Sequence, residues 1–469
     1  MKTPYFSANI IEPIKKLKGD NFVKIKAFVL FVICCLLLVI SVGGCAPSKK
    51  SGPAEKVVEM WVMPNSLNPV TDIEDLLKPF EEKTGIKVKV TSVDWGAGWS
   101  KITTAATSGD VPDIAQLGST WVSAITAMGA LEEISKESIA KLGGAQTFVP
   151  VAWQTSQIEG SGKITAIPWF VDARAIFLRT DAFAKAGINT SNLADWDSFK
   201  SSLKKLYDAD IVMDGQPMAP LGISGKNDWN VIHSLAPWIW MAGGDFLSPD
   251  RKKCILDSEA AFAGVTYYLG LVKDGFVPTE YLELNTAQVS ANFNSGACAM
   301  YFDGPYEIRT LTRPESEGGA GGSPTAKNFA VTSYPTGPKG RITFVGGSQL
   351  AIFKQGKNKA GAFEVIKYLT AKKPQVDYAK ATGFLPARKD AFSDPFFAAD
   401  QHRKIFKDAV FYGRTYPSIP AWGLLEPILT RRFGIMWDYV LSGSDYNPEK
   451  IREQLKLAKQ EVEAVLNQK

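Results

Sequence analysis

Short strand patterns alternate with amphipathic helix patterns from residue 57 onward, and this alternation limits the possible folds more than any other feature. Apolar and β-branched runs predict strands, whereas apolar residues spaced three and four apart predict helices. The expected elements are strands at 57–62, 86–90 and 113–117, each followed by a helix, at 71–82, 99–107 and 120–128. Such alternation predicts an α/β fold with a parallel sheet covered by helices on both faces. Ligands of these sheets bind at the carboxyl ends of the strands.

The expected helix at 71–82 has a capping signal at its start and a proline in its interior. Thr71 and Glu74 have the spacing of a capping box, in which each side chain bonds the other residue's backbone N–H. Pro79 lies within the apolar pattern. We expect it to kink or shorten the helix, because proline lacks the amide hydrogen.

The amino-terminal segment has the pattern of a lipoprotein leader. Lys24 and Lys26 precede an apolar run, 27–40, and Val42-Gly43-Gly44 places small residues directly before Cys45. Signal peptidases require small residues before the cut, and the thiol of Cys45 is the group that would carry lipid. A transmembrane anchor is the alternative, but the run is shorter than the roughly 20 residues that span a bilayer. We therefore expect a signal peptide at 1–44 and a lipidated polar tether at 45–55.

Removal of the leader changes the charge of the chain. The 53 basic and 48 acidic residues of the whole chain become 47 and 46 once six lysines and two acidic residues of the leader are lost. A nearly neutral protein has no electrostatic reason to bind nucleic acid or another polyanion.

Two cysteines remain in the folded region, Cys254 and Cys298. A disulfide between them is compatible with an extracytoplasmic location, and two buried free thiols are the alternative. The sequence leaves both open.

The 425 residues after the leader exceed what one hydrophobic core usually holds, so we expect two lobes.

Several segments resemble the extracellular solute-binding lipoproteins of carbohydrate ABC importers, the relatives of maltose-binding protein. The resemblance covers nearly the whole mature chain, and it rests on the order and spacing of segments 109–114, 162–168, 293–300, 303–306, 346–352, 360–370 and 383–388. Two positions depart from the family pattern: Cys298 lies in a strand, and Tyr306 stands where many relatives carry tryptophan.

The resemblance implies two α/β lobes joined by three crossings, with the ligand held in a hinged cleft between them. The crossings are expected near 168–174, 343–347 and 408–412. Lobe 1 would comprise 56–167 and 347–407, and lobe 2 would comprise 168–346 and 408–469. The implied partners are a sugar or oligosaccharide and the transmembrane subunits of an ABC permease, with the protein acting as a monomer held to the membrane through Cys45.

Twelve tryptophans, all beyond the leader, supply an independent chemical signal. A sugar ring has an apolar C–H face that packs on flat aromatic rings, and a rim of hydroxyls that needs polar partners. The aromatic candidates, chosen from strand-end loops or by the family's cleft positions, are Trp121, Trp238, Trp240, Trp422 and Tyr306. For each, packing in the core is the alternative. We expect Ile419-Pro-Ala-Trp422 to be a loop that presents its aromatic ring.

Polar candidates lie at the first crossing and at strand or helix ends. In relatives an acidic side chain at the place of Asp172 binds sugar hydroxyls, and Arg174 would share its face of the chain. An Asp–Arg pair that only stiffens the hinge is the alternative. His233, on an expected helix at 230–242, could equally be a core histidine, and Asn65 is a weaker candidate at the end of the first strand.

A secreted, lipid-anchored glycoside-processing enzyme is the competing function, because two opposed carboxylates would suffice for it. The chain has no G-x-S-x-G, H-E-x-x-H, P-loop or C-x-x-C motif, and its two histidines offer little basis for an imidazole metal site. We therefore expect a binding protein without catalytic residues, metal or cofactor.

Overall fold

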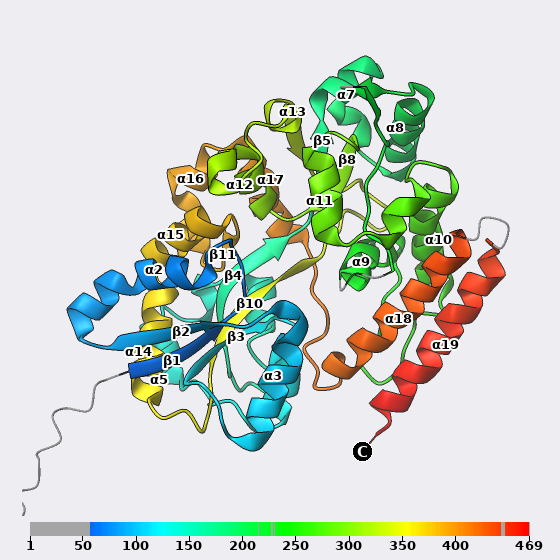
Figure 1. Ribbon diagram of the computed structural model, residues 1–469. Coiled ribbons are helices and arrows are strands. Elements are labelled where there is room, and N and C mark those ends of the chain that lie inside the picture. The colour runs from blue at the N-terminus through cyan, green and yellow to red at the C-terminus, as the bar shows by residue number, and fades with distance from the viewer. Residues whose placement is uncertain (1–56, 214, 227, 229, 442–445, 469) are drawn as a thin grey trace, which may run out of the picture. The chain divides into compact units, whose positions relative to one another are not determined.

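The computed structural model describes residues 57–468 except 214, 227, 229 and 442–445 (Figure 1). The expected signal peptide, the tether and Cys45 lie outside the described residues. Among the residues that are described, no helix combines the length and apolar character needed to cross a membrane.

A six-stranded sheet forms the first part of the fold, with strand order β11-β4-β10-β3-β1-β2. Its strands are β1 Val57–Val62, β2 Lys87–Ser92, β3 Ile114–Gly118, β4 Ile167–Ala173, β10 Val345–Ile352 and β11 Leu385–Pro386. The three expected strands are confirmed, and β1 pairs in parallel with both β2 and β3. The prediction of a wholly parallel sheet is wrong, because β10 comes from a distant part of the chain and pairs antiparallel with β3 and β4.

The helices that accompany this sheet include the three that the sequence predicts. They are α2 Pro69–Thr84, α3 Trp95–Ser108, α4 Val122–Ala127, α5 Lys136–Lys141, α6 Pro150–Gln154, α14 Lys359–Leu369, α15 Lys372–Thr382 and α16 Pro395–Ala398. A further helix, α17 Gln401–Tyr412, packs against β4 and also against strands of the second sheet. The segment 360–370, one of those on which the resemblance rests, forms most of α14.

The ends of α2 differ from the prediction. The helix begins at Pro69, two residues before Thr71, and its N-cap is Asn68. This N-cap makes no side-chain hydrogen bond, so the predicted capping box of Thr71 and Glu74 does not form. Pro79 does not shorten the helix, which continues to Thr84 and ends at Gly85 in a left-handed conformation. The proline is exposed, so water can bond the carbonyl that its missing N–H leaves unpaired.

A second, three-stranded antiparallel sheet has the order β8-β5-β9. Its strands are β5 Ala175–Arg179, β8 Met300–Asp303 and β9 Phe329–Thr332, and a small hairpin pairs β6 Val212–Met213 with β7 Gln216–Pro217. The helices of this part are α7 Thr180–Lys185, α8 Trp196–Asp208, α9 Val231–Ala242, α10 Glu259–Lys273, α11 Thr286–Asn294, α12 Tyr306–Thr312 and α13 Pro324–Lys327. Short 3-10 turns occur at Ala145–Thr147, Thr190–Leu193, Thr279–Glu283, Glu315–Glu317 and Lys389–Ser393.

Two long helices end the chain, α18 Trp422–Leu441 and α19 Pro448–Leu466, and they lie side by side (Figure 1). Asn447 caps α19 by accepting a hydrogen bond from the backbone N–H of Glu449. The apolar stripe of α19 is buried as its spacing predicts, at Ile451, Leu455, Ala458 and Val462. The hairpin packs through α18 against α9 and α10.

Three stretches of backbone run together where the chain leaves one sheet for the other. Arg174 separates β4 from β5, and its carbonyl accepts a hydrogen bond from Thr343 Oγ1 at 2.8 Å. Phe344 bridges to Arg414, which follows α17. These stretches are adjacent to the expected crossings, and the exact lobe boundaries remain a proposal.

Cys254 and Cys298 are both buried free thiols, so the structure has the second of the two arrangements that the sequence left open. Burial raises the pKa of the Cys254 thiol to about 12 and that of Cys298 further still. Neither thiol is therefore ionised or reactive near neutral pH.

Candidate functional site

A cleft of about 580 Å³ separates residues of the first part of the fold from the helix α18. Trp99 of α3 and Trp121, directly before α4, form one side. The opposite side comes from α18 and from Lys226, in the segment that precedes α9. The lining residues are Trp99, Trp121, Lys226, Gly423, Glu426, Pro427, Thr430, Arg431, Gly434, Ile435 and Asp438.

Three half-buried tryptophans pack together at the aromatic side of the cleft, and two of them, Trp99 and Trp121, line it. Trp121 packs edge to face against Trp95, with ring centroids 5.6 Å apart, and against Trp99, at 5.9 Å. Asp94 starts α3 by accepting hydrogen bonds from the backbone of Gly96 and Ala97, which places Trp95 and Trp99 on the first turns of the helix. The fixed rings present flat apolar surface at low entropic cost.

Gly98 makes the approach of Trp121 possible. A Cβ atom at residue 98 would lie 3.2 Å from Trp121 Cη2 and 3.1 Å from Met63 Cε. Any larger residue would therefore push the Trp121 ring out of its present position.

The polar side of the cleft carries both signs of charge. Lys226 Nζ lies 2.7 Å from Asp438 Oδ1 and 2.9 Å from Glu283 Oε1, and Arg431 pairs with Glu461 at 2.5 Å. These two cations are therefore largely compensated within the protein.

Glu426 has a different environment, although it lines the same cleft. Its side chain is 20 % exposed, and His233 Nε2 lies 3.7 Å from Oε1. Burial raises the pKa of the Glu426 carboxyl to about 7, against a smaller opposing effect of Thr120. Glu426 is thus a carboxyl group that can exchange its proton near neutral pH.

The first crossing holds a buried ionic cluster. Arg174 Nη1 lies 3.1 Å from Asp172 Oδ2, 3.3 Å from Asp303 Oδ1 and 3.3 Å from the Tyr306 hydroxyl, which in turn hydrogen-bonds Asp303. These residues come from β4, the link to β5, the end of β8 and the start of α12. Burial raises the pKa of the Asp172 carboxyl to about 6, because desolvation outweighs the attraction of Arg174. Three of the predicted site residues, Asp172, Arg174 and Tyr306, are therefore brought together here.

A cluster of stacked rings lies behind the Glu426 side of the cleft. The His233 ring stacks on Phe344 with centroids 4.3 Å apart, and its Nδ1 lies 2.8 Å from the Tyr416 hydroxyl. Tyr416 stacks in turn on Trp422, at 4.5 Å. Burial, aided by the positive charge of Arg174, lowers the pKa of His233 to about 3, so its imidazole is neutral at physiological pH.

Three of the candidate tryptophans lie in the core and not at the cleft surface. Trp422 is the first residue of α18 and fully buried, so the expected loop that presents its ring is wrong. Trp238 is fully buried among aromatic rings that include Trp196 and Tyr268. Trp240 is 2 % exposed, and its Nε1 donates to Asp245 at 3.2 Å. In α9 the aromatic residues face the packed interior, which their helical spacing alone could not reveal.

Asn65 follows β1 and is half-buried. Its Nδ2 donates to Gln116 Oε1 at 3.0 Å and to the Tyr378 hydroxyl at 2.9 Å. Gln116 Nε2 continues this network to Ser348 Oγ at 2.8 Å. Asn65 thus lies at the carboxyl end of its strand, as expected, and its side chain is engaged within the protein.

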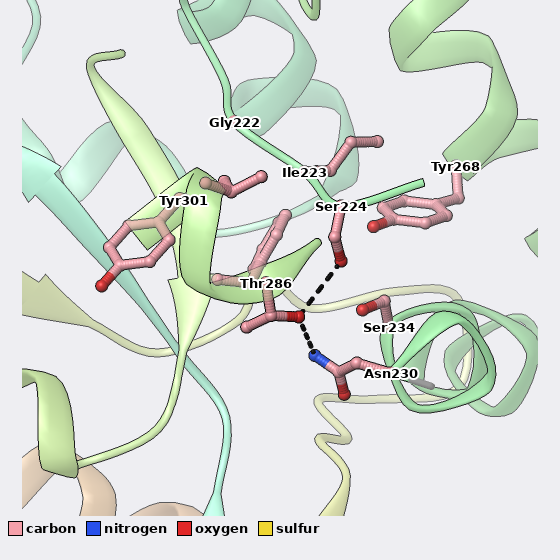
Figure 2. A pocket seen from close by; sticks show the side chains of 10 residues that line it. Gly222, Ile223, Ser224, Asn230, Ser234, Tyr268, Thr286 and Tyr301 are labelled. Carbon is pink, nitrogen blue, oxygen red and sulfur yellow. Dashed lines mark hydrogen bonds between the residues drawn. The ribbon is translucent and has the colours of Figure 1, made fainter. Parts of the chain in front are cut away.

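A second cavity, shown in Figure 2, is far smaller, with a volume of about 10 Å³. Asn230 Nδ2 donates to Thr286 Oγ1 at 3.3 Å, and that hydroxyl donates to Ser224 Oγ at 3.4 Å. The volume accommodates about one water molecule and no saccharide. Among the described residues, no group of three or more His, Cys, Asp or Glu side chains is arranged to hold a metal ion.

Sequence reasoning found Trp121 at the cleft but missed Trp99 and Glu426. The glycine-rich turn around Trp99, Gly96-Ala-Gly98, was the available signal for an exposed aromatic ring. Glu426 gave no signal, because an acidic residue in a helical pattern is usually a solvated surface residue.

Comparisons with known proteins show the family and the fold of the chain. The family model for bacterial extracellular solute-binding proteins matches residues 75–405. A diacetylchitobiose binding protein of Streptomyces coelicolor is 27% identical over 421 residues, covering 85% of this chain and 91% of its own. A maltooligosaccharide ABC transporter solute-binding lipoprotein of Streptococcus pneumoniae is 21% identical over 382 residues, covering 80% and 83%. Among solved structures, an ABC transporter solute-binding protein of Thermotoga lettingae bound with α-D-tagatose superimposes with a TM-score of 0.72 at 22% identity, covering 88% of this chain and 100% of that one. The structural likeness shows a two-lobed binding-protein fold.

Proposed function

We propose that this chain, which belongs to the family of bacterial extracellular solute-binding proteins, captures a neutral sugar or oligosaccharide for an ABC importer. The observation that carries this proposal is the cleft, in which tryptophan rings face a side of α18 that carries both polar and apolar residues. Two relatives named for diacetylchitobiose and maltooligosaccharide binding support the same class of ligand.

The two sides of the cleft match the two chemical characters of a saccharide. The C–H face of a sugar ring would lie on Trp121 or Trp99, where the apolar area buried by each stacked ring is worth on the order of 1 kcal/mol. The hydroxyl rim would meet Glu426 and the Lys226–Asp438 pair, which together offer acceptors and donors. A volume of about 580 Å³ is within the range of cavities that bind small molecules.

The buried ionic cluster at the first crossing would supply a second group of polar contacts to the ligand. Asp172 is half-buried, with 13 % of its side chain exposed, and its Oδ1 has no hydrogen-bond partner among the described residues. A buried carboxylate oxygen without a partner is costly unless a ligand or water bonds it. We propose that Asp172, oriented by Arg174, accepts a hydroxyl of a bound sugar when the lobes close.

We further propose that the protein is a monomer anchored to the outer face of the cell membrane by lipid on Cys45, and that it delivers the saccharide to the permease subunits. The small residues before Cys45 support the anchor, as does the description of the Streptococcus pneumoniae relative as a lipoprotein. Lobe 1 (56–167 and 347–407) and lobe 2 (168–346 and 408–469) would close around the ligand at the hinge near Arg174.

We propose that the protein is not a glycoside-processing enzyme, and the separation of the acidic residues along α18 supports this. A glycosidase places its two carboxyl groups about 5–9.5 Å apart. The two acidic residues that line the cleft, Glu426 and Asp438, lie on one helix, where 12 residues span roughly 18 Å at 1.5 Å per residue. These two residues therefore do not form the pair that a glycoside-processing enzyme needs.

The direct test is a titration of the mature protein, residues 46–469, with maltose, maltotriose, cellobiose and N,N′-diacetylchitobiose. Tryptophan fluorescence should change saturably with one of these compounds, which chromatography should then recover intact. Release of monosaccharide at a rate proportional to protein concentration would support the enzyme instead. Absence of binding to every compound would contradict the proposed ligand class.

A further inference from the structure

Tyr416, His233 and Glu426 form a chain of polar groups that ends in the cleft. The Tyr416 hydroxyl lies 2.8 Å from His233 Nδ1, and the other ring nitrogen, Nε2, lies 3.7 Å from Glu426 Oε1. The imidazole cannot tilt freely, because it is 7 % exposed and stacks on Phe344 at an interplanar angle of 4°. His233 therefore connects a buried hydroxyl to the carboxyl group that a ligand would meet.

The neutral imidazole allows two proton arrangements in this chain. Burial keeps the Tyr416 hydroxyl protonated, because it raises the pKa well above its ordinary value. If that hydroxyl donates to Nδ1, then Nε2 carries the hydrogen and favours an ionised Glu426. If Nδ1 donates to Tyr416 instead, Nε2 is an acceptor and favours a protonated Glu426. The tautomer of His233 thus sets the direction of a dipole that acts on Glu426 across 3.7 Å, without a direct hydrogen bond.

The charged groups around Glu426 do not fix its protonation state. Glu426 faces the neutral His233 of α9. It also faces Thr120, just before α4, and Tyr416, just before α18, and neither of these carries a charge. On its own helix, Arg431 and Asp438 line the same cleft, but they pair with Glu461 and with Lys226.

We propose that Glu426 is a ligand contact that regulates affinity, with saccharide hydroxyls donating to its ionised carboxylate so that binding releases its proton to solvent. The inference rests on the proposed function and names a regulation of the same site. An ionised carboxylate accepts two or more hydroxyl hydrogen bonds, and charge-assisted bonds of this kind are about twice as strong as neutral ones. A protonated carboxyl group retains one oxygen as acceptor and offers a competing donor.

The sign of the pH dependence follows from this linkage. Because burial raises the pKa of Glu426 to about 7, the carboxyl group of the free protein is mainly protonated below that pH. Ligand binding must then expel the proton, so the dissociation constant should rise as the pH falls below about 7, by up to roughly tenfold per pH unit. Above pH 8 the dissociation constant should be independent of pH.

The first experiment needs no ligand. Protein labelled with ¹³C at the glutamate side-chain carboxyl is titrated by NMR from pH 4.5 to 9, and the resonance missing from Glu426→Gln identifies this group. We expect a midpoint near pH 7. In His233→Leu, which removes the imidazole dipole, the midpoint should shift, upward if Nε2 carries the hydrogen and downward if Nε2 is an acceptor. In His233→Gln, which restores a polar side chain, the midpoint should return toward the wild-type value. A midpoint near that of an exposed glutamate in the wild type would overturn the inference.

The second experiment uses the compound of the saccharide panel that binds most tightly. Calorimetry at pH 6.5 in phosphate and in imidazole, whose ionisation enthalpies differ, should show release of between zero and one proton in the wild type and none in Glu426→Gln. Glu426→Gln should bind at least about tenfold more weakly at pH 8 and show no pH dependence. A wild-type dissociation constant that is constant from pH 5.5 to 8.5 would refute the proton linkage while leaving the proposed function intact. Failure of every saccharide to bind would refute both.

Discussion

Trp99 lies directly against Gly423 across the cleft, and a Cβ atom at residue 423 would lie only 2.6 Å from Trp99 Cη2. The aromatic side of the cleft thus depends on the absence of a side chain at the start of α18. This contact joins α3, which accompanies the six-stranded sheet, to the carboxy-terminal hairpin.

Gly423→Ala should therefore displace the Trp99 ring and weaken saccharide binding severalfold, although it adds no charge and removes no polar group. Calorimetric titration with the panel compound that binds would measure the change. Gly270→Ala is the matched control, because Gly270 also lies in a helix and a Cβ there would meet nothing within 4 Å. Equal affinities of both variants and the wild type would show that the position of Trp99 has no role in binding.

Trp121→Ala should weaken binding at least about tenfold, which corresponds to roughly 1.4 kcal/mol, because a stacking surface is lost. The ring is half-buried, so the loss of stability should be moderate. Trp153→Ala provides the comparison: that ring is also half-buried, stacks on Phe148, and does not line the cleft. If the two variants bind the saccharide equally well, Trp121 is a packing residue.

Trp422→Ala should lower the free energy of unfolding by about 3–5 kcal/mol, because it removes a fully buried ring that stacks on Tyr416. Trp422→Phe keeps an aromatic ring and should cost less. Urea denaturation followed by circular dichroism measures both. A Trp422→Ala variant of wild-type stability would instead return Trp422 to the list of ligand contacts.

Glu307→Gln should reduce the loss of stability at alkaline pH. The side chain is buried, Ser290 donates to its Oε2 at 3.0 Å, and burial next to Asp303 raises the pKa of the carboxyl group. A carboxyl group with a raised pKa stabilises the fold most at low pH, and its contribution is lost as the pH rises through that value. The melting temperature of the wild type should therefore fall more steeply from pH 5 to pH 9 than that of Glu307→Gln.

The exposed Glu315 supplies the control for that experiment. Glu315→Gln should have the same pH dependence of melting temperature as the wild type. If Glu307→Gln does so as well, the buried carboxyl group does not determine the alkaline loss of stability.

Local patterns in the sequence predicted the strands and helices well, because burial of one face imposes a regular apolar spacing. The positions of β1 and β3 follow from such patterns. The antiparallel pairing of β10 could not be predicted from the local alternation, since it is decided by a return of the chain from the second sheet. The start of α2 was missed because Pro69, and not the Thr71 side chain, marks its first turn.

The candidate site was predicted only in part, because a sequence does not reveal which side of an aromatic residue faces solvent. Trp121 and Trp422 both follow short polar or proline-containing segments, yet one lines the cleft and the other is fully buried. Asp172 and Arg174 were placed together correctly because they are two residues apart in an extended segment. Glu426 becomes recognisable only when α18 is packed opposite Trp99 and Trp121.

A crystal structure of the protein with the tightest-binding panel compound would show whether a saccharide binds between Trp121 and Glu426. We expect a sugar ring stacked on Trp121 or Trp99, with carbon atoms about 3.5–4 Å from the indole, and a hydroxyl within hydrogen-bond distance of Glu426. A saccharide bound elsewhere, with this cleft filled only by water, would contradict it.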